Sequence, residues 1–264
     1  MAANGFETRL ERLELKYLLD ERRARQVRRW IRAYCSPDPH NQRGDRGGPD
    51  GYLLRSLYVD TPALAFHHAK ERGDADRFKM RVRSYRGLDA ACLEIKRRSS
   101  DVVRKTRVLV SREGLKETLR GTGKPWDEKP ASRQVLDLFS RLMLQTGAEP
   151  KLVVQYHREA YVSDVDSYAR VTFDRDIAFQ RTEKWSLETD DRGWKKLNDY
   201  WVGSSPLVIL ELKCETKVPA WLLDLVRDME LRRASVSKYS TGIYVTRREL
   251  GGSVSERAQQ GVLR

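Results

Sequence analysis

The chain has 264 residues, 39% of them hydrophobic, which is enough to build one large domain or two small ones around a sizeable core. Its 51 Lys and Arg residues outnumber its 38 Asp and Glu residues, so we expect anionic partners such as nucleic acid, nucleotide, a phosphate chain or an acidic membrane surface. Three widely spaced cysteines without a Cys-x-x-Cys motif argue for reduced thiols and against a structural zinc site. The N-terminal MAANGFETRLER has no apolar run, so we expect no signal peptide, no membrane span and a cytoplasmic location.

The first predicted elements are a strand and a basic helix. Alternating polar and apolar side chains predict a strand over 11–19, after which Asp20 is placed to cap a helix over 21–34. The arginines of that helix are typical of a solvated outer face, although a basic helix also suits acidic lipid or nucleic acid. The segment SPDPHNQRGDRGGPDG at 36–51 is predicted to be a mobile loop within one domain, because the strand pattern resumes after it.

A hairpin over 77–98, RFKMRVRSYRGLDAACLEIKRR, occupies the middle of the predicted fold, with its turn at 86–89. A strand over 52–60 and a short helix ending near residue 71 precede the hairpin, and a strand over 101–110 follows it. Helices are expected over 111–120 and 132–145, and the second has an apolar stripe at helical spacing that core packing explains.

The C-terminal third is predicted to contain strands over 152–162, 167–176 and 207–215. Pro219 is placed to open a helix, and VSKYSTGIYV is predicted to put Ser237, Lys238 and Tyr239 at the start of a final strand. Between the strands, the aromatic residues of the segment 181–205 suit packing onto the sheet better than base stacking. These aromatic residues are Trp185, Trp194, Tyr200 and Trp201. The predicted organisation is a single domain over 1–250 and a disordered tail over 251–264.

Charged and apolar residues alternate on five of these strands. The polar positions are Arg12, Glu14 and Lys16; Lys79, Arg81, Arg83 and Tyr85; Glu94, Lys96 and Arg98; Arg170, Thr172 and Asp174; and Glu211, Lys213 and Glu215. One interpretation is an ordinary sheet whose charges face solvent. The other is a closed sheet with helices outside and an ionic lumen, where inward-facing ions must pair, stay wet or meet a charged ligand. An excess of Arg and Lys with a few carboxylates then suits a polyanion that brings a divalent metal.

Several familiar kinds of site are missing from the sequence. There is no Gly-x-x-x-x-Gly-Lys-Ser/Thr phosphate loop, no dinucleotide fingerprint and no Gly-x-Ser-x-Gly motif. The histidines do not have the spacing of metal ligands, and neighbouring His67 and His68 on a helix would point in different directions.

Seven short motifs, taken in order, resemble the polyphosphate-polymerase domain of vacuolar transporter chaperone (VTC) complexes over about residues 6–247. They are Arg12-x-Glu14-x-Lys16-Tyr17, Ser56-Leu57-Tyr58-Val59-Asp60-Thr61, Lys79-x-Arg81-x-Arg83-x-Tyr85, Leu93-Glu94-Ile95-Lys96, Arg170-Val171-Thr172-Phe173-Asp174, Leu210-Glu211-Leu212-Lys213 and Ser237-Lys238-Tyr239. That domain belongs to the triphosphate tunnel metalloenzymes (CYTH-like), with thiamine triphosphatases, tripolyphosphatases, RNA triphosphatases and class IV adenylate cyclases. The sequence departs from the polymerase relatives at Ser235, where they carry a second lysine.

The resemblance implies an α+β fold, an antiparallel eight-stranded barrel with helices packed outside, whose tunnel holds a triphosphate. The implied phosphate-binding residues are Lys16, Arg81, Arg83, Lys96, Lys105, Arg107, Arg158, Lys213 and Lys238. The implied catalytic residues are Lys16, Arg81, Arg83, Lys96, Arg158 and Glu211. Mn²⁺ or Mg²⁺ would be held mainly by Glu211, and Glu14 and Glu94 match acidic positions that bind metal in the hydrolase branch.

The implied function is transfer of the terminal phosphoryl group of ATP to a growing inorganic polyphosphate chain. A triphosphatase on the same fold is the first alternative, in which Glu14 or Glu94 would position the attacking water. A non-catalytic module that binds polyphosphate or nucleic acid is the second. The expected partners are ATP and polyphosphate or tripolyphosphate rather than nucleic acid, and a membrane protein that receives the polymer is compatible with a chain lacking its own span.

Overall fold

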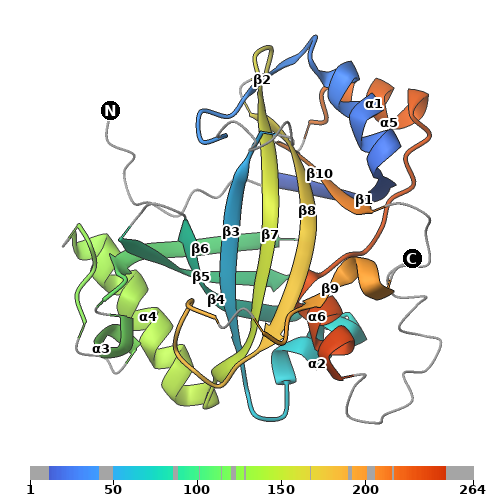
Figure 1. Cartoon of the computed structure of the whole chain (residues 1–264). Coiled ribbons are helices and arrows are strands. Elements are labelled where there is room, and N and C mark those ends of the chain that lie inside the picture. The colour runs from blue at the N-terminus through green and yellow to red at the C-terminus, as the bar shows by residue number, and fades with distance from the viewer. Residues whose placement is uncertain are drawn as a thin grey trace. The chain divides into compact units, whose positions relative to one another are not determined.

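The computed structural model describes residues 12–41, 50–85, 89–100, 102–113, 115–119, 123–127, 129–166, 168–189, 192–200, 206–215 and 217–247. Over these residues the chain is a mixed α+β protein built on long antiparallel strands, which confirms the predicted class (Figure 1). No helix in these ranges is long and apolar enough to span a bilayer. The chain divides into two compact units. Unit 1 holds the described residues of 54–154 and 180–193, and unit 2 those of 10–53, 155–179 and 194–247.

Four antiparallel strands lie wholly or mainly in unit 2. Their order is β1 (Arg12–Asp20), β10 (Leu207–Glu215), β8 (Ala169–Arg181) and β7 (Glu149–Ser163), with β2 (Cys35–Pro37) paired to β7 and β9 (Lys195–Lys196) paired to β8. The register places Lys16 opposite Glu211 and Lys213 opposite Arg170. Charged residues far apart in sequence therefore become neighbours on one face.

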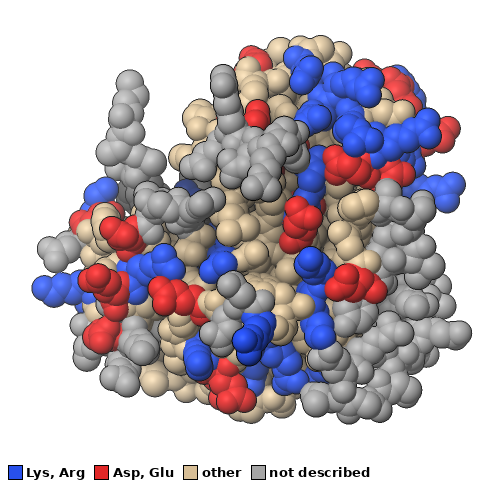
Figure 2. Space-filling view, viewed as in Figure 1, with Lys and Arg blue, Asp and Glu red and all other residues tan. Residues whose placement is uncertain are grey.

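Helices cover the other face of these strands. α1 (Glu21–Ile31) begins at the predicted cap, where the Asp20 carboxylate accepts a hydrogen bond of 2.7 Å from the backbone N–H of Arg23. It ends three residues before the predicted end at 34. α5 (Ala220–Asp228) lies beside α1 (Figure 1), α1 packs on β1 and β10, and α5 adds Trp221, Leu222 and Leu225 to the same core. The core between helices and strands includes Tyr17, Val27, Ile31, Val171, Phe173, Leu210, Leu212, Trp221 and Leu225. Lys and Arg atoms gather over α1 (Figure 2).

Unit 1 contains the strands β3 (Tyr52–Asp60), β4 (Asp76–Tyr85), β5 (Ala90–Ser99) and β6 (Val102–Ser111), neighbours in that order. The predicted hairpin is confirmed as β4 and β5, and β3 begins and ends at the predicted residues. α4 (Pro130–Thr146) packs on β5 and β6 and buries Phe139, and α2 (Ala65–Arg72) packs on β4, with the rings of Phe66 and Phe78 4.4 Å apart.

The final predicted strand is wrong, because VSKYSTGIYV forms a helix. α6 (Lys238–Arg247) follows Ser237, whose hydroxyl accepts a hydrogen bond of 3.3 Å from the backbone N–H of Ser240. Eight of its ten residues are buried, so the segment shows neither the period of a strand nor that of an amphipathic helix. β-Branched residues suggested a strand, and tertiary packing with a serine cap overrides that preference.

The predicted helix over 111–120 is also too long. β6 continues through Ser111, and a single short helix, α3 (Leu115–Leu119), follows it. In the aromatic-rich segment, η2 (Leu197–Tyr200) is a 3-10 turn, and Trp201 lies outside the described residues. Residues 42–49 of the predicted loop and the predicted disordered tail lie outside them too.

The two faces of the sheets differ as the charge alternation predicted. In unit 2, the face opposite α1 and α5 carries Lys16, Thr172, Asp174 and Glu211, of which the last three are buried. Over the described residues neither four-stranded set closes on itself, so the eight-stranded barrel and the single domain stay predictions. All three cysteines are buried free thiols, as predicted.

Candidate functional site

A buried glutamate on β10 is surrounded by cations in unit 2. Glu211 alternates with Leu210 and Leu212, so its side chain points to the ionic face while theirs enter the core. Its Oε1 atom lies 3.0 Å from Lys238 Nζ and 3.6 Å from Lys16 Nζ. Its Oε2 atom lies 3.1 Å from Lys213 Nζ and 3.2 Å from an Arg158 guanidinium nitrogen. Four predicted site residues, Lys16, Arg158, Lys213 and Lys238, thus surround a fifth, Glu211.

Asp174 completes this cluster and was missing from the predicted site. It is fully buried on β8, and Arg158 donates to it from two nitrogens at 2.6 and 2.7 Å, the two-pronged geometry of an arginine–carboxylate pair. Lys238 Nζ lies 2.6 Å from the same carboxylate and 4.9 Å from the ring centroid of Tyr156. The motif from Arg170 to Asp174 contained the signal, but only the pairing of β8 with β10 shows that Asp174 lies beside Glu211.

The electrostatics of the unit 2 cluster stabilise the charged forms of Glu211 and Lys238. Burial alone would raise the pKa of Glu211, but the charges of Lys238, Lys213, Lys16 and Arg158 outweigh burial and lower it well below its usual range. Burial likewise opposes the charge of Lys238, yet Asp174 and Glu211 raise its pKa above the usual lysine value. Glu211 and Lys238 are therefore both ionised at neutral pH. Glu14, half-buried, lies 3.3 Å from Lys16 Nζ and belongs to its edge.

A second buried glutamate organises a separate cluster in unit 1. Glu94 is 2% exposed, pairs with Arg81, and lies 2.6 Å from Lys105 Nζ and 4.0 Å from Arg83. Burial would raise its pKa, but Arg81, Arg83 and Lys105 lower it far below the usual range. The cross-strand register explains the grouping, since Arg81 lies opposite Glu94 on the paired strand.

Hydroxyl groups of β3 hold the two arginines of this cluster. Arg81 donates to the Tyr58 hydroxyl at 3.0 Å and Arg83 donates to the Ser56 hydroxyl at 3.1 Å. In each case the hydroxyl residue lies opposite its arginine in the β3–β4 register. The sequence motif at 56–61 contained both hydroxyls, but no role was predicted for them.

Lys96 and Arg107 lie at the periphery of the unit 1 cluster, and their predicted role in phosphate binding stays a prediction. Both side chains are exposed, Lys96 opposite Lys105 and Arg107 opposite Glu94 in the β5–β6 register. Their strand positions put them on the same face as Glu94, at the solvent side of the cluster. The structure thus groups Arg81, Arg83, Glu94 and Lys105 directly and places these two beside them.

The predicted metal ligands Glu211, Glu14 and Glu94 carry carboxylates, the chemical type of ligand that Mg²⁺ and Mn²⁺ prefer. Each Glu211 oxygen lies near two side-chain cations, and Glu94 is enclosed by three. Within the described ranges no three Asp, Glu, His or Cys side chains gather as a metal site requires. As arranged, these residues do not fit a bound divalent ion, and the roles of Glu211, Glu14 and Glu94 as metal ligands stay predictions.

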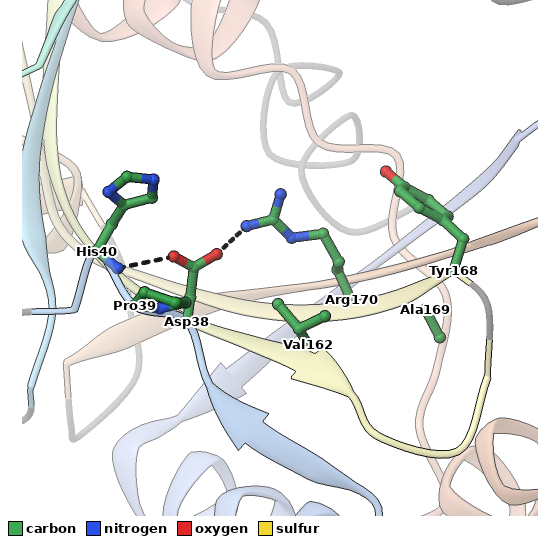
Figure 3. Close-up of a pocket in the computed structure, with 7 residues that line it drawn as sticks. All are labelled: Asp38, Pro39, His40, Val162, Tyr168, Ala169 and Arg170. Carbon is green, nitrogen blue, oxygen red and sulfur yellow. Dashed lines mark hydrogen bonds and ion pairs between the residues drawn. The ribbon is translucent and has the colours of Figure 1, made fainter. Parts of the chain in front are cut away.

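A pocket of about 310 Å³ lies next to the ionic face of unit 2. Its lining consists of Asp38, Pro39, His40, Val162, Tyr168, Ala169 and Arg170 (Figure 3). Arg170 pairs with buried Asp38, whose other oxygen accepts a hydrogen bond of 2.9 Å from the backbone N–H of His40. The acidic and basic charges of the pocket therefore neutralise each other, and no predicted site residue is in its lining.

The fold and the two clusters define a class of protein: an α+β protein whose antiparallel strands carry a helix-covered apolar face and an ionic face with cations in excess. Residues 11–247 match the family model of the VTC domain, so the chain belongs to the VTC domain family, as its motifs predicted. A search of curated proteins gave no match.

Solved structures provide more distant similarities. PH1819 from Pyrococcus horikoshii OT3 is 12% identical, with 88% of this chain and 98% of that chain covered and a TM-score of 0.43. A candidate adenylate cyclase from Bacillus halodurans is 12% identical (86% and 96% covered, TM-score 0.45). A candidate adenylyl cyclase from Hippeastrum with a dominant triphosphatase activity is 15% identical (88% and 94% covered, TM-score 0.44). At TM-scores below 0.5 these similarities do not establish a function for the chain.

Proposed function

We propose that this protein is a polyphosphate polymerase that transfers the terminal phosphoryl group of ATP to a growing inorganic polyphosphate chain. The observation that carries the proposal is the presence of two clusters in which a buried glutamate is enclosed by Arg and Lys side chains. In unit 1, three cations face Glu94. In unit 2, Lys16, Arg158, Lys213 and Lys238 face Glu211 and Asp174.

The excess of cations suits a phosphate chain in particular. Phosphate oxygens accept the same hydrogen bonds that the carboxylates accept now, from the forked guanidinium groups of Arg81, Arg83 and Arg158 and from lysine point charges. In phosphoryl transfer, most of the protein's contribution is to position the reactants and to stabilise charge on the transferred group. Side chains fixed by hydroxyls and carboxylates on rigid strands meet both requirements.

The state of the predicted water-positioning residues favours a polymerase over a hydrolase. A hydrolase needs a carboxylate that is available to orient water, whereas an attacking phosphate is already an anion and needs no general base. Glu94 is buried and enclosed by three cations, and Glu14 lies beside Lys16. Both glutamates thus serve to orient cations, which is the role expected in the polymerase branch.

The proposal includes two finer features implied by the family resemblance. One is closure of the strands into an eight-stranded tunnel, and the other is dependence on Mn²⁺ or Mg²⁺. Because side-chain cations occupy both oxygens of Glu211, we assign no step of the reaction to a metal. Metal dependence is tested directly by the experiment below.

The test is incubation of purified protein with ATP, with and without Mn²⁺ or Mg²⁺, followed by gel separation of phosphate polymers and assay of free phosphate. We expect a ladder of polyphosphate that Glu211→Gln abolishes. Glu215→Gln, four residues along the same strand, is the matched control and should keep the ladder. Free phosphate without polymer would replace the proposal with a triphosphatase, and no product with any metal would favour a binding module.

A further inference from the structure

Three arginines on the solvent side of α1 form a row with Arg32, the residue that caps the C-terminus of the helix. Arg22, Arg25, Arg29 and Arg32 are all exposed, and they follow one another at intervals of three, four and three residues. Residues at this spacing lie along one line of a helix. With a rise of about 1.5 Å per residue, the row is about 15 Å long. We call these four residues the α1 arginine row.

The row differs from the other arginines of the helix, which have partners within unit 2. Arg28 lies 3.4 Å from the carboxylate of Glu159, and Arg23 donates to the backbone carbonyl of Met229. Over the described ranges, no ion pair or hydrogen bond involves the side chains of the four arginines in the row. Like charges at this spacing repel one another and destabilise an isolated helix. An anion bound along the row would therefore reduce the repulsion among the four arginines.

A buried network holds the helix in one orientation. Arg175 donates to Glu21 at the start of α1 at 2.9 Å and to Glu159 at 2.8 Å. Glu159 also accepts a hydrogen bond of 2.6 Å from the Tyr161 hydroxyl and contacts Arg28. The network fixes the angle at which α1 presents the row. A fixed row binds a ligand with less loss of side-chain and backbone freedom than a flexible basic segment.

The surroundings of the row decide among anionic partners. Ala24, Val27 and Ile31 of α1 are fully buried in the core, and Trp30 is partly buried against it, so the helix has no free apolar face to insert into a membrane. The nearby rings of Trp30, Tyr34 and Trp221 stack on one another, at centroid distances of 5.0 and 5.3 Å, so they are already engaged and offer no platform for bases. A straight row of cations without an apolar face for a membrane or free aromatic rings for bases suits a linear polyanion that lacks bases.

We propose that the α1 arginine row is a second polyphosphate-binding surface, separate from the ionic clusters, along which a long inorganic polyphosphate chain lies. This inference rests on the proposed function, because it takes the ligand to be the product of that reaction. The binding is noncovalent and electrostatic, so it should weaken steeply with salt. It should favour long chains, because tripolyphosphate is too short to contact the whole row.

Binding of preformed long-chain polyphosphate, labelled at one end and followed by fluorescence anisotropy without ATP, tests the proposal. The test variant changes the whole row to Gln (Arg22→Gln, Arg25→Gln, Arg29→Gln and Arg32→Gln), which keeps helix-forming side chains. The matched control removes four exposed positive charges from unit 1 (Lys124→Gln, Arg141→Gln, Lys184→Gln and Arg192→Gln). A third variant changes the row to Lys and so keeps its charge. Tripolyphosphate binding, measured calorimetrically, reports on the ionic clusters.

We expect the Gln variant to lose about tenfold or more in affinity for long polyphosphate, with a shallower salt dependence. The unit 1 control and the Lys variant should change less than about twofold, and tripolyphosphate binding should be the same in all four proteins. An equal loss in the control, an unchanged Gln variant, a parallel loss of tripolyphosphate binding, or tighter binding of single-stranded RNA than of polyphosphate would each overturn the inference. Because no ATP is present, failure of the polymerase assay leaves these results unaffected.

Discussion

Asp174 is the residue that fixes the geometry of the unit 2 cluster. Arg158 and Lys238 both contact its carboxylate, and both also contact Glu211. Two carboxylates therefore share the same two cations in a buried setting. When one member of a buried ion pair is removed, the other charge stays buried without an opposite charge and without hydration, which is energetically costly.

We predict that Asp174→Asn lowers the free energy of unfolding by about 3–5 kcal/mol. Asn keeps the size of the side chain but not the negative charge that holds Arg158 and Lys238. Urea unfolding measures the effect. Asp176→Asn is the control, since Asp176 is exposed on the same strand and its replacement should change stability by less than about 0.5 kcal/mol. Equal stabilities of the two variants would contradict this account of the cluster.

His157 should make stability fall as the pH falls. Partial burial lowers the pKa of this half-buried histidine, and the nearby charge of Arg175 lowers it further. The unfolded chain therefore takes up a proton near pH 6.5 before the folded chain does, so stability is lost as the pH drops below about 6.5. We predict a shallower dependence between pH 7 and 5 for His157→Gln than for the wild-type protein, measured by urea unfolding. A steeper dependence in His157→Gln would reverse the sign of the proposed effect.

At the scale of elements, the start of α6 links a helix cap to the ionic cluster. Ser237 caps the helix, and Lys238, its first residue, reaches Asp174 and Glu211. A helix that frays at this end would release the lysine from both carboxylates. The cap therefore positions a predicted phosphate-binding residue without touching the phosphate.

We predict that Ser237→Ala destabilises the protein by about 1 kcal/mol and weakens tripolyphosphate binding, because Lys238 is held less firmly. Thermal unfolding and calorimetric titration measure the two effects. Ser235→Ala, two residues earlier and exposed, should affect neither. A loss of stability without any change in binding would show that the cap does not position Lys238.

Strands were predicted well from the sequence where one face is apolar and the other ionic. β10 begins and ends at the predicted residues, because its alternation over nine residues has no helical equivalent. β3 also begins and ends at the predicted residues, although it is not one of the alternating strands. The same reasoning wrongly predicted a strand at α6. Because this helix is buried on nearly all sides, its sequence shows no periodic alternation of polar and apolar residues. This reasoning also placed the start of a helix at Ser111, which is the last residue of β6 in the structure.

The members of the site were easier to predict than their arrangement. Lys16, Glu94 and Glu211 stand out because charges at alternate positions are unusual on a strand facing other protein atoms. The role of Asp174 depends on the pairing of β8 with β10 and on the helix that brings Lys238 to it, and neither is visible in a linear pattern. Likewise, the positions of Lys96 and Arg107 beside the unit 1 cluster depend on the register between β5 and β6, which the sequence alone does not show.

At the scale of the whole molecule, a net charge of +13 is combined with carboxylates that are already neutralised by neighbouring cations. A divalent cation added alone therefore has no open set of acidic ligands in the described part of the chain. A phosphate chain, in contrast, meets an excess of positive charge. The folded protein should respond to the anion rather than to the metal.

We predict that Mn²⁺ or a chelator alone leaves the melting temperature unchanged, whereas tripolyphosphate raises it. At a ligand concentration one hundred times the dissociation constant, the gain is about 2.7 kcal/mol. Sulfate at equal ionic strength controls for general screening. A clear rise with Mn²⁺ alone would mean that the carboxylates rearrange into a metal site, and no rise with tripolyphosphate would count against both clusters as phosphate sites.

If a phosphate chain binds to the two clusters as proposed, the enclosed glutamates have a consequence for its binding kinetics. Glu94 and Glu211 act as built-in competitors, because an arriving phosphate must exchange with a tethered carboxylate instead of filling an empty site. Each exchange trades one anion for another, so the net gain per contact is small and the reverse exchange is fast. A chain held by many such reversible exchanges can be retained along its length and still advance one unit at a time.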